Sequence, residues 1–293
     1  MSLPITPECL LCHFRRNLKR AQELGDEQKA MSFAKELMQI YISAPEGVSS
    51  PWLNPGVRAL FEKHYGLAGD QYAEEKAAAN HFVLERLEQI RVMAENTADP
   101  VMAGLRLAIL GNYLDFAALQ DAVSFAELDD MLKKALDMEL DEVCCRQFCQ
   151  ELASAKKLLY LTDNAGEIGF DRIFAEQLQK AYPRLEIIFC VRGGNILNDA
   201  TREDAAIVGI PFSVIDNGNL VSGTEISLLS EEAKHAMDTA DVILAKGMAN
   251  TETLLGCGYP VYYAFLVKCI RFVRQFGQPL MTPMFVREQS KKL

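Results

Sequence analysis

The sequence lacks several features that would place it in a specialised class of protein. No window approaches the run of about 18 apolar residues that a membrane-spanning helix needs, so we expect no membrane partner. The first residues, MSLPITPECLLCHFRRNLKR, lack the basic-then-apolar order of a secretion signal, and we expect a cytoplasmic protein. Positive charge is also in short supply: the net charge of −10 argues against nucleic-acid binding, which needs a basic face.

Cysteine is too sparse and too scattered for a disulfide framework. The 293 residues include eight cysteines without a secretion signal, which indicates reduced thiols. Cys9 and Cys12 form one Cys-x-x-Cys pair beside His13, but no second pair completes a zinc site. Packing, a free thiol pair and a metal site all remain open for these two cysteines.

Two common nucleotide-binding fingerprints are missing. The chain has no G-x-x-x-x-G-K-[ST] motif and no G-x-G-x-x-G after its first predicted strand, which excludes P-loop NTPases and typical dinucleotide folds. A phosphatase with a second acid two residues after an Asp163 nucleophile is excluded too, because that position is Ala165. A methyltransferase is a closer alternative, since an Asp-x-x-Gly bend after a first strand can hold a nucleoside cofactor. The second predicted strand, however, ends in VRGGN and offers no acid for a ribose.

The hydrophobic periodicity divides the chain into two parts. Residues 1–155 show helical spacing of apolar residues and no β-alternation, which predicts a helical domain. Asp99 and Pro100 are predicted to be the N-cap and the first residue of one of its helices. The predicted helices cover 26–44, 70–97, 99–119, 124–140 and 141–155.

Residues 156–293 alternate short apolar runs with helical stretches. This order predicts an α/β fold: a three-layer α/β/α domain with a mainly parallel sheet covered on both faces. The predicted strands are 157–163, 185–194, 212–218, 241–247 and 260–267, and 278–286 is a candidate edge strand.

Polar residues follow the predicted strands at the edge where parallel sheets bind ligands. The first strand ends in DNAGE (163–167), the second in RGGN (192–195) and the fourth in Lys246-Gly247. Carboxylates and amides without histidine suit Mg²⁺ or Mn²⁺, and Lys246, Arg192 and backbone amides suit a phosphate. The alternative is that these residues only end strands and cap helices. Because several loops repeat the same chemistry, we favour metal-assisted phosphoryl chemistry.

Several of these segments resemble one known family. TDNAGEIGFD (162–171), VRGGNILNDAT (191–201), DNG (216–218) with SGTE (222–225), and ILAKGMANTET (243–253) resemble the damage-control phosphatases, formerly known as domain of unknown function 89. PECLLC (7–12) and LGNYLDF (110–116) resemble its prokaryotic branch. The resemblance implies a helical domain joined to an α/β/α domain, and metal-dependent hydrolysis of phosphomonoesters such as sugar phosphates or damaged phosphometabolites.

The resemblance also implies roles for individual residues. Its metal ligands correspond to Asp163, Asn164 and Asp199, which would hold one divalent cation, Mg²⁺, Mn²⁺, Co²⁺ or Ni²⁺. Its phosphate-binding lysine corresponds to Lys246, and Glu167 would hold an attacking water, although Asp163 could itself be the nucleophile. We further expect substrate binding by residues of the strand-end loops, namely Arg192, Asn195, Asn198, Gly223, Thr224 and Asn250. The expected partner is a small phosphorylated metabolite.

Two competing functions use the same loops. The chain could bind a phosphorylated metabolite without turning it over, or it could be an S-adenosylmethionine-dependent carboxyl methyltransferase, an activity also proposed in the wider family. Thr251 departs from the family pattern, which often has an aromatic residue there. Asp115, an acid in an apolar stretch, either faces the crevice or forms a structural ion pair.

Overall fold

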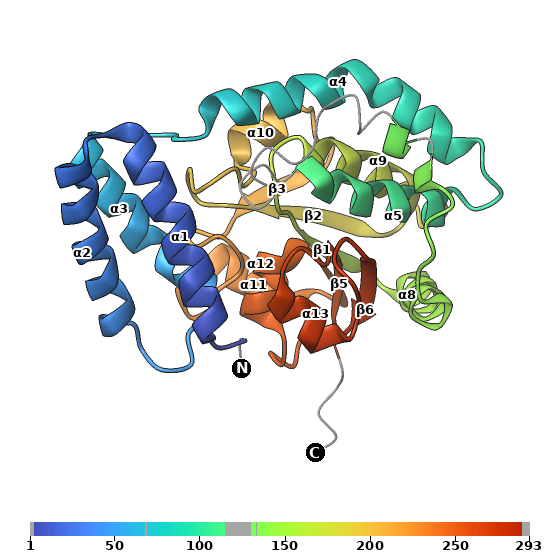
Figure 1. Cartoon of the computed structure of the whole chain (residues 1–293). Coiled ribbons are helices and arrows are strands. Elements are labelled where there is room, and N and C mark those ends of the chain that lie inside the picture. Colours follow the sequence, from blue (N-terminus) through green and yellow to red (C-terminus); the bar gives the residue numbers. More distant parts are fainter. Residues whose placement is uncertain (1–2, 68, 115–129, 133, 289–293) are drawn as a thin grey trace.

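Helix follows helix along the first half of the chain, and among the described residues the first strand begins at Lys157 (Figure 1). The computed structural model describes residues 3–67, 69–114, 130–132 and 134–288. Its helices are α1 (Pro7–Leu24), α2 (Glu27–Ser43), α3 (Asn54–Tyr65), α4 (Ala73–Glu95), α5 (Pro100–Gly111), α8 (Glu142–Ser154), α9 (Glu167–Ala181), α10 (Arg202–Ile207), α11 (Glu231–Thr239), α12 (Gly247–Leu254) and α13 (Ile270–Phe276), with the 3₁₀ helices η1 (Ser50–Leu53), η2 (Asn112–Leu114) and η3 (Ile226–Leu228). The strands are β1 (Lys157–Leu161), β2 (Glu186–Val191), β3 (Ser213–Asp216), β4 (Val242–Lys246), β5 (Val261–Leu266) and β6 (Pro283–Arg287).

Capping side chains fix where the helices begin. The side chain of Asp99 accepts a hydrogen bond from Met102 N at 3.0 Å, and Pro100 is the first helical residue of α5, as predicted. Asp26 and Asp141 cap α2 and α8 in the same way. None of the described helices is both long enough and apolar enough to cross a membrane.

The described strands form one sheet in the order β3-β2-β1-β4-β5-β6. The strands β1 to β5 pair in parallel, and β6 pairs antiparallel with β5 as the predicted edge strand. Leu161 near the end of β1 lies beside Cys190 of β2 and Ala245 of β4. The carboxyl ends of these three strands therefore meet at one edge of the sheet, where the polar residues were predicted to gather.

Helices cover both faces of the sheet. On one face, Tyr160, Phe189 and Tyr262 share a core with residues of α5, α8 and α9, and α4 packs outside α5 and α9. On the other face, Tyr263 and Phe265 share a core with α11, α12 and α13. The predicted α/β class with a mainly parallel, covered sheet is confirmed.

The helices before the sheet do not form one separate core. The helices α1, α2 and α3 pack around Phe33 and Phe61 in a cluster of their own, beside the edge where the strands end (Figure 1). The helices α5 and α8, which also precede residue 156, belong to the core of the sheet. The division into domains 1–155 and 156–293 stays a prediction.

Candidate functional site

The bend between β1 and α9 brings a carboxylate, an amide and the start of a helix close together. Gly166 has a φ of 75°, and a Cβ there would lie 2.7 Å from the Cβ of Ala79 in α4. Its N–H donates to Asn80 Oδ1 at 2.7 Å. Only glycine therefore lets α4 approach this closely while α9 begins at the next residue.

Two amides fix the carboxylate of Asp163. Its Oδ2 accepts hydrogen bonds from Asn112 Nδ2 at 3.0 Å and from Asn164 Nδ2 at 2.9 Å. Both amides also donate to Glu167 Oε2, at 2.9 and 2.8 Å. With its Nδ2 held in this way, the Oδ1 of Asn164 accepts no hydrogen bond from any residue that the structure describes.

A buried arginine lies between the two aspartates of the site. Arg192 Nε donates to Asp199 Oδ2 at 2.6 Å, and Ser222 Oγ donates to Asp199 Oδ1 at 2.5 Å. Arg192 Nη2 lies 3.8 Å from Asp163 Oδ1 and has no hydrogen-bond partner within the described chain. Because an orphaned buried donor is costly, this atom is suited to an anionic ligand beside Asp163.

Next to these side chains lies a cavity of about 130 Å³, which Asn112, Glu167 and Arg192 do not line. Asp163, Asn164, Asn198, Asp199 and Ser222 line it from the strand ends. Its other walls come from α1, η1, α3, α12 and the loop between β2 and α10. They consist of Arg16, Ser50, Pro51, Asn54, Leu197, Met248, Ala249 and Glu252. The helices α1 to α3, together the α1–α3 unit, therefore contribute a wall to the cavity at the strand ends.

The donor set of this cavity fits a hard divalent cation. Over the described residues, no three His, Cys, Asp or Glu side chains cluster as a metal site of their own. A cation here would need an amide oxygen beside the carboxylates of Asp163 and Asp199, and Asn164 Oδ1 is not engaged by the protein. Carboxylate and amide oxygens are the ligands that Mg²⁺ and Mn²⁺ prefer.

Lys246 and Glu167 lie beneath the cavity rather than on its wall. Lys246 Nζ donates to Glu167 Oε1 at 2.7 Å, to Asp171 Oδ1 at 2.6 Å and to Ala108 O at 2.8 Å, so its three protons are used. The side chains of Lys246, Glu167 and Asp171 are all 0% exposed. In this geometry Lys246 does not point its ammonium group into the cavity. Its contact with a phosphate stays a prediction.

The charges of this buried group depend on one another. Burial opposes the charge on Lys246, but the carboxylates of Asp171 and Glu167 outweigh burial and raise the pKa of its ammonium. Burial raises the pKa of Asp171 to about 7, against the opposing effect of Lys246. Tyr160 donates to the same aspartate at 2.8 Å. The group is a tightly coupled support for the bend above it.

The remaining predicted substrate residues separate into two sets. Asn198 lines the cavity, whereas Asn195 lies on an adjoining cavity and accepts from Lys76 Nζ at 3.4 Å. Thr224 Oγ1 donates to Asn250 Oδ1 at 2.8 Å, and Asn250 Nδ2 donates to backbone carbonyls of the β1 and β4 ends.

Gly223 has a φ of 130°, and a Cβ there would lie 2.7 Å from the carbonyl oxygen of Ala249. Gly223, Thr224 and Asn250 thus brace the loops and do not line the cavity. Asp115 lies outside the described residues.

Sequence reasoning missed three residues that contribute to this site. Arg16 of α1 lines the cavity and makes no hydrogen bond or ion pair with any residue in the described ranges. Asn112 orients Asp163, and Asp171 holds Lys246. Asn112 and Asp171 stand inside the segments LGNYLDF and TDNAGEIGFD, but nothing in the sequence indicated that α1 reaches the strand ends.

Comparison with known proteins agrees with this architecture. A family described as damage-control phosphatase ARMT1-like domain matches residues 5–282. A protein from Archaeoglobus fulgidus named damage-control phosphatase is 31% identical over 281 residues, 94% of each chain. An uncharacterized protein from Methanocaldococcus jannaschii is 33% identical over 290 residues, 94% of this chain and 93% of the relative.

A solved structure shares the fold over almost the whole chain. It is the crystal structure of a DUF89 family protein from Pyrococcus horikoshii, with a TM-score of 0.84 and 24% identity, covering 98% of this chain and 99% of that one. At this identity the likeness establishes the fold alone. The extent of the sequence matches settles the family, and the chain belongs to the damage-control phosphatase ARMT1-like family.

Proposed function

We propose that the chain is a metal-dependent phosphatase that hydrolyses phosphomonoesters of small metabolites, sugar phosphates or damaged phosphometabolites among them. One observation carries the proposal: the carboxyl groups of Asp163, Asp199 and Glu252, the free amide oxygen of Asn164 and the guanidinium of Arg16, which makes no hydrogen bond with any described residue, line one cavity. Oxygen ligands beside a cation match a phosphate ester bound through a divalent metal ion. The name of the relative from Archaeoglobus, damage-control phosphatase, supports the reaction class.

The metal would be held by Asp163, Asn164 and Asp199. When bound, it supplies positive charge for the phosphoryl oxygens and lowers the pKa of a coordinated water. Mg²⁺, Mn²⁺, Co²⁺ and Ni²⁺ are all candidates for this role. The cavity otherwise presents only protein groups to the substrate.

The protein's own cations share the charge of the phosphoryl group. Because the three protons of Lys246 are used below the cavity, we assign this role to Arg16 and Arg192. Arg16 reaches the cavity from α1, and Arg192 Nη2 lies 3.8 Å from Asp163 Oδ1 and has no hydrogen-bond partner within the described chain. Guanidinium groups suit phosphate oxygens because their planar donors match them in pairs.

Glu167 positions the site in this proposal. One of its oxygens accepts from Lys246, and the other accepts from Asn112 and Asn164. It thereby holds the amide side of Asn164 so that the carbonyl oxygen is left for a ligand. The attacking group is then a water in the cavity or a carboxylate oxygen of Asp163, both of which remain compatible with the geometry.

Hydrolysis of p-nitrophenyl phosphate by metal-stripped protein, with single cations added back, tests the proposal. We expect turnover only with a divalent cation, and a loss of about 100-fold or more in Asp163→Asn and in Arg16→Gln. Arg15→Gln is the matched control, because Arg15 is an exposed arginine on the same helix and lines neither cavity.

Two outcomes would contradict the phosphatase proposal. Metal binding without turnover of any ester would favour a phosphometabolite-binding protein. Binding of S-adenosylmethionine with methyl transfer to a carboxylate would favour the methyltransferase alternative.

A further inference from the structure

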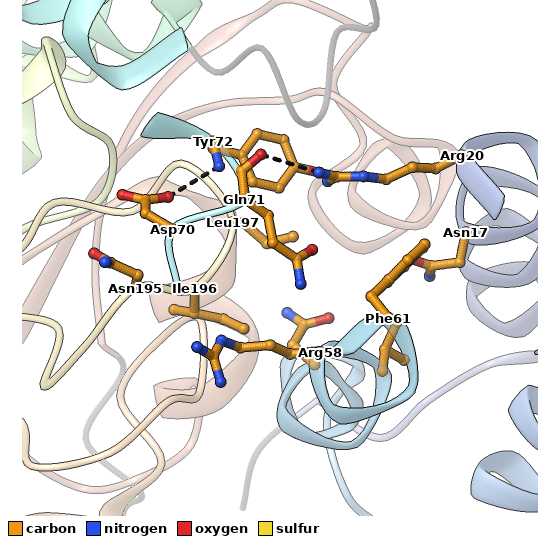
Figure 2. Close-up of a pocket in the computed structure, with 12 residues that line it drawn as sticks. Asn17, Arg20, Arg58, Phe61, Asp70, Gln71, Tyr72, Asn195, Ile196 and Leu197 are labelled. Atoms are coloured by element: carbon orange, nitrogen blue, oxygen red, sulfur yellow. Dashed lines mark hydrogen bonds between the residues drawn. The ribbon is translucent and has the colours of Figure 1, made fainter. Parts of the chain in front are cut away.

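A second cavity adjoins the first and shares two wall residues with it. Asn54 and Leu197 line both cavities. Figure 2 shows Arg20 of α1 and Arg58 of α3 reaching from two helices toward the loop that carries Asn195 and Leu197. Its volume is about 30 Å³, which is room for one compact group rather than a ring.

The charge on the walls of this second cavity is positive. Arg58 Nε is buried and, as far as the chain is described, has no hydrogen-bond partner. Arg58 Nη2 donates to Gly69 O at 3.2 Å, and Nη1 lies 4.0 Å from the half-exposed Glu62. Arg20 keeps its guanidinium over the ring of Tyr72, 4.3 Å from the centroid, and donates one bond to Gln71 O at 3.0 Å. Both guanidiniums are therefore held in place with donors to spare.

The carboxylate on this wall is already neutralised. Among the described lining residues the acid is Asp70, and its Oδ2 accepts from Lys76 Nζ at 3.1 Å. Lys76 also pairs with Asp204 at 2.9 Å. Apart from the long ion pair of Arg58 with Glu62, which lies outside the lining, the two arginines have no carboxylate partner among the described residues of this wall.

Amide side chains complete the cavity and are oriented by a neutral histidine. His13 Nδ1 lies 2.8 Å from Tyr41 Oη and 3.2 Å from Asn17 Nδ2, and His13 Nε2 lies 3.1 Å from Asn54 Oδ1. Burial lowers the pKa of His13 to about 4, so it is uncharged at neutral pH. A neutral His13 that donates from Nε2 leaves the Asn54 NH₂ group to serve as a donor to a ligand.

The loop between the cavities is held in an unusual conformation. Leu197 has a φ of 47°, in the left-handed region that bulky residues rarely adopt. On one side of it Asn195 lines the second cavity, and on the other Asn198 and Asp199 line the first. Local strain of this kind collects at ligand sites, where the surrounding structure enforces it.

We infer that the second cavity is a subsite for an additional anionic group of the substrate, with the body of the substrate passing between Asn54 and Leu197. The inference rests on the proposed function, and it specifies the substrate class: a phosphomonoester that carries a second anion, by the size of the cavity a carboxylate. Arg58 and Arg20 recognise this group, and Asn54 and Asn195 add hydrogen bonds.

Matched pairs of esters test the subsite. The pairs are 3-phosphoglycerate with glycerol 3-phosphate, 6-phosphogluconate with glucose 6-phosphate, and fructose 1,6-bisphosphate with fructose 6-phosphate, assayed on the metal-loaded protein. We expect kcat/KM to be at least tenfold higher for one of the two carboxylate members than for its partner, and Arg58→Gln to abolish that preference. Preference for the bisphosphate alone would still support an anion subsite but overturn its assignment to a carboxylate.

The controls separate this inference from the proposed function. Arg15→Gln should keep the preference, and thermal melting should show that Arg58→Gln is folded. Hydrolysis of all six esters without any preference would overturn the subsite and leave the phosphatase intact. If no ester is hydrolysed, calorimetric binding of the same pairs decides: tenfold tighter binding of a member that carries the second anionic group supports the subsite, and equal binding overturns it.

Discussion

Replacing Lys246 by methionine tests whether this lysine supports the fold or contacts the substrate. The structure places its ammonium on Glu167, Asp171 and the carbonyl of Ala108, out of contact with solvent. Methionine keeps most of the aliphatic volume, so little cavity is created. The change removes one cation and leaves two buried carboxylates without it.

The expected cost follows from this geometry. Removing one partner of a buried ion pair costs about 3–5 kcal/mol, and Lys246 serves two carboxylates, so we expect the upper end of that range at pH 8. The cost depends on pH because burial already raises the pKa of Asp171 to about 7, and loss of the ammonium raises it further.

The direction of the pH dependence is fixed by that raised pKa. A carboxyl group with a raised folded-state pKa favours folding below its unfolded pKa, and this contribution is lost as the pH rises through the folded value. The deficit of the Lys246→Met variant should therefore be largest at pH 8 and smaller at pH 5.5.

Urea unfolding at pH 8 and pH 5.5 measures both effects. Adding Asp171→Asn to Lys246→Met should recover part of the lost stability at pH 8, since it removes one unpaired charge. Lys234→Met is the control, because Lys234 pairs with Asp238 at an exposed position and its loss should change stability little and equally at both pH values. A loss below about 1 kcal/mol in Lys246→Met, equal at both pH values, would refute the reasoning.

Two further substitutions test the walls of the site. Gly247→Ala should destabilise the protein by well over the roughly 1–3 kcal/mol of backbone strain alone, because at a φ of 77° its Cβ would lie 1.8 Å from Asp163 Oδ2. Gly258→Ala, at a φ of 84° in open space, should show only the strain, and equal losses in urea unfolding would contradict the clash. Glu252→Gln should raise stability by up to about 3 kcal/mol at pH 8.5, because burial raises the pKa of Glu252 to about 7 against the nearby Arg271 and Arg16. That gain should shrink as the pH falls below 7 and vanish below the ordinary glutamate pKa of 4.5, where Glu252 is neutral in the folded and the unfolded state, and a gain that is independent of pH would contradict it.

The order of secondary structure was largely predictable because periodicity reports it directly. The five parallel strands lie within the predicted runs, and the weak signal at 278–286 covers all of β6 except its last residue, Arg287. Each strand stops before or at the polar residues that end its run, as at Leu161 before Asp163, because those side chains turn into the crevice instead of pairing. The predicted helix at 124–140 lies mostly outside the described residues.

The partners of the helices were less predictable. An amphipathic stripe shows that a helix is half buried, but it does not say against what. The helices α5 and α8 belong to the core of the sheet although they precede it in sequence, whereas α1 to α3 pack around their own cluster. Contacts between residues separated by more than 100 positions, such as Lys246 with Ala108, depend on this packing and leave no local pattern.

Some residues of the site could be predicted from local sequence patterns, and others depend on how the helices pack. Asp163 and Asn164 were identifiable as polar residues at a strand end, and the family resemblance added Asp199; the structure brings all three to one cavity. The burial of Glu167 could also have been predicted. Asp171 follows Glu167 by four residues on α9, so both carboxylates lie on the same face of the helix. Lys246, at the end of the neighbouring strand, is the cation that pairs with both. Arg16 and Arg58 were not readable, because only the docking of α1 and α3 beside the strand ends brings their guanidiniums to the two cavities. Under the proposed function, the sheet would position the reacting phosphate, and the helices α1 to α3 would select which esters fit beside it.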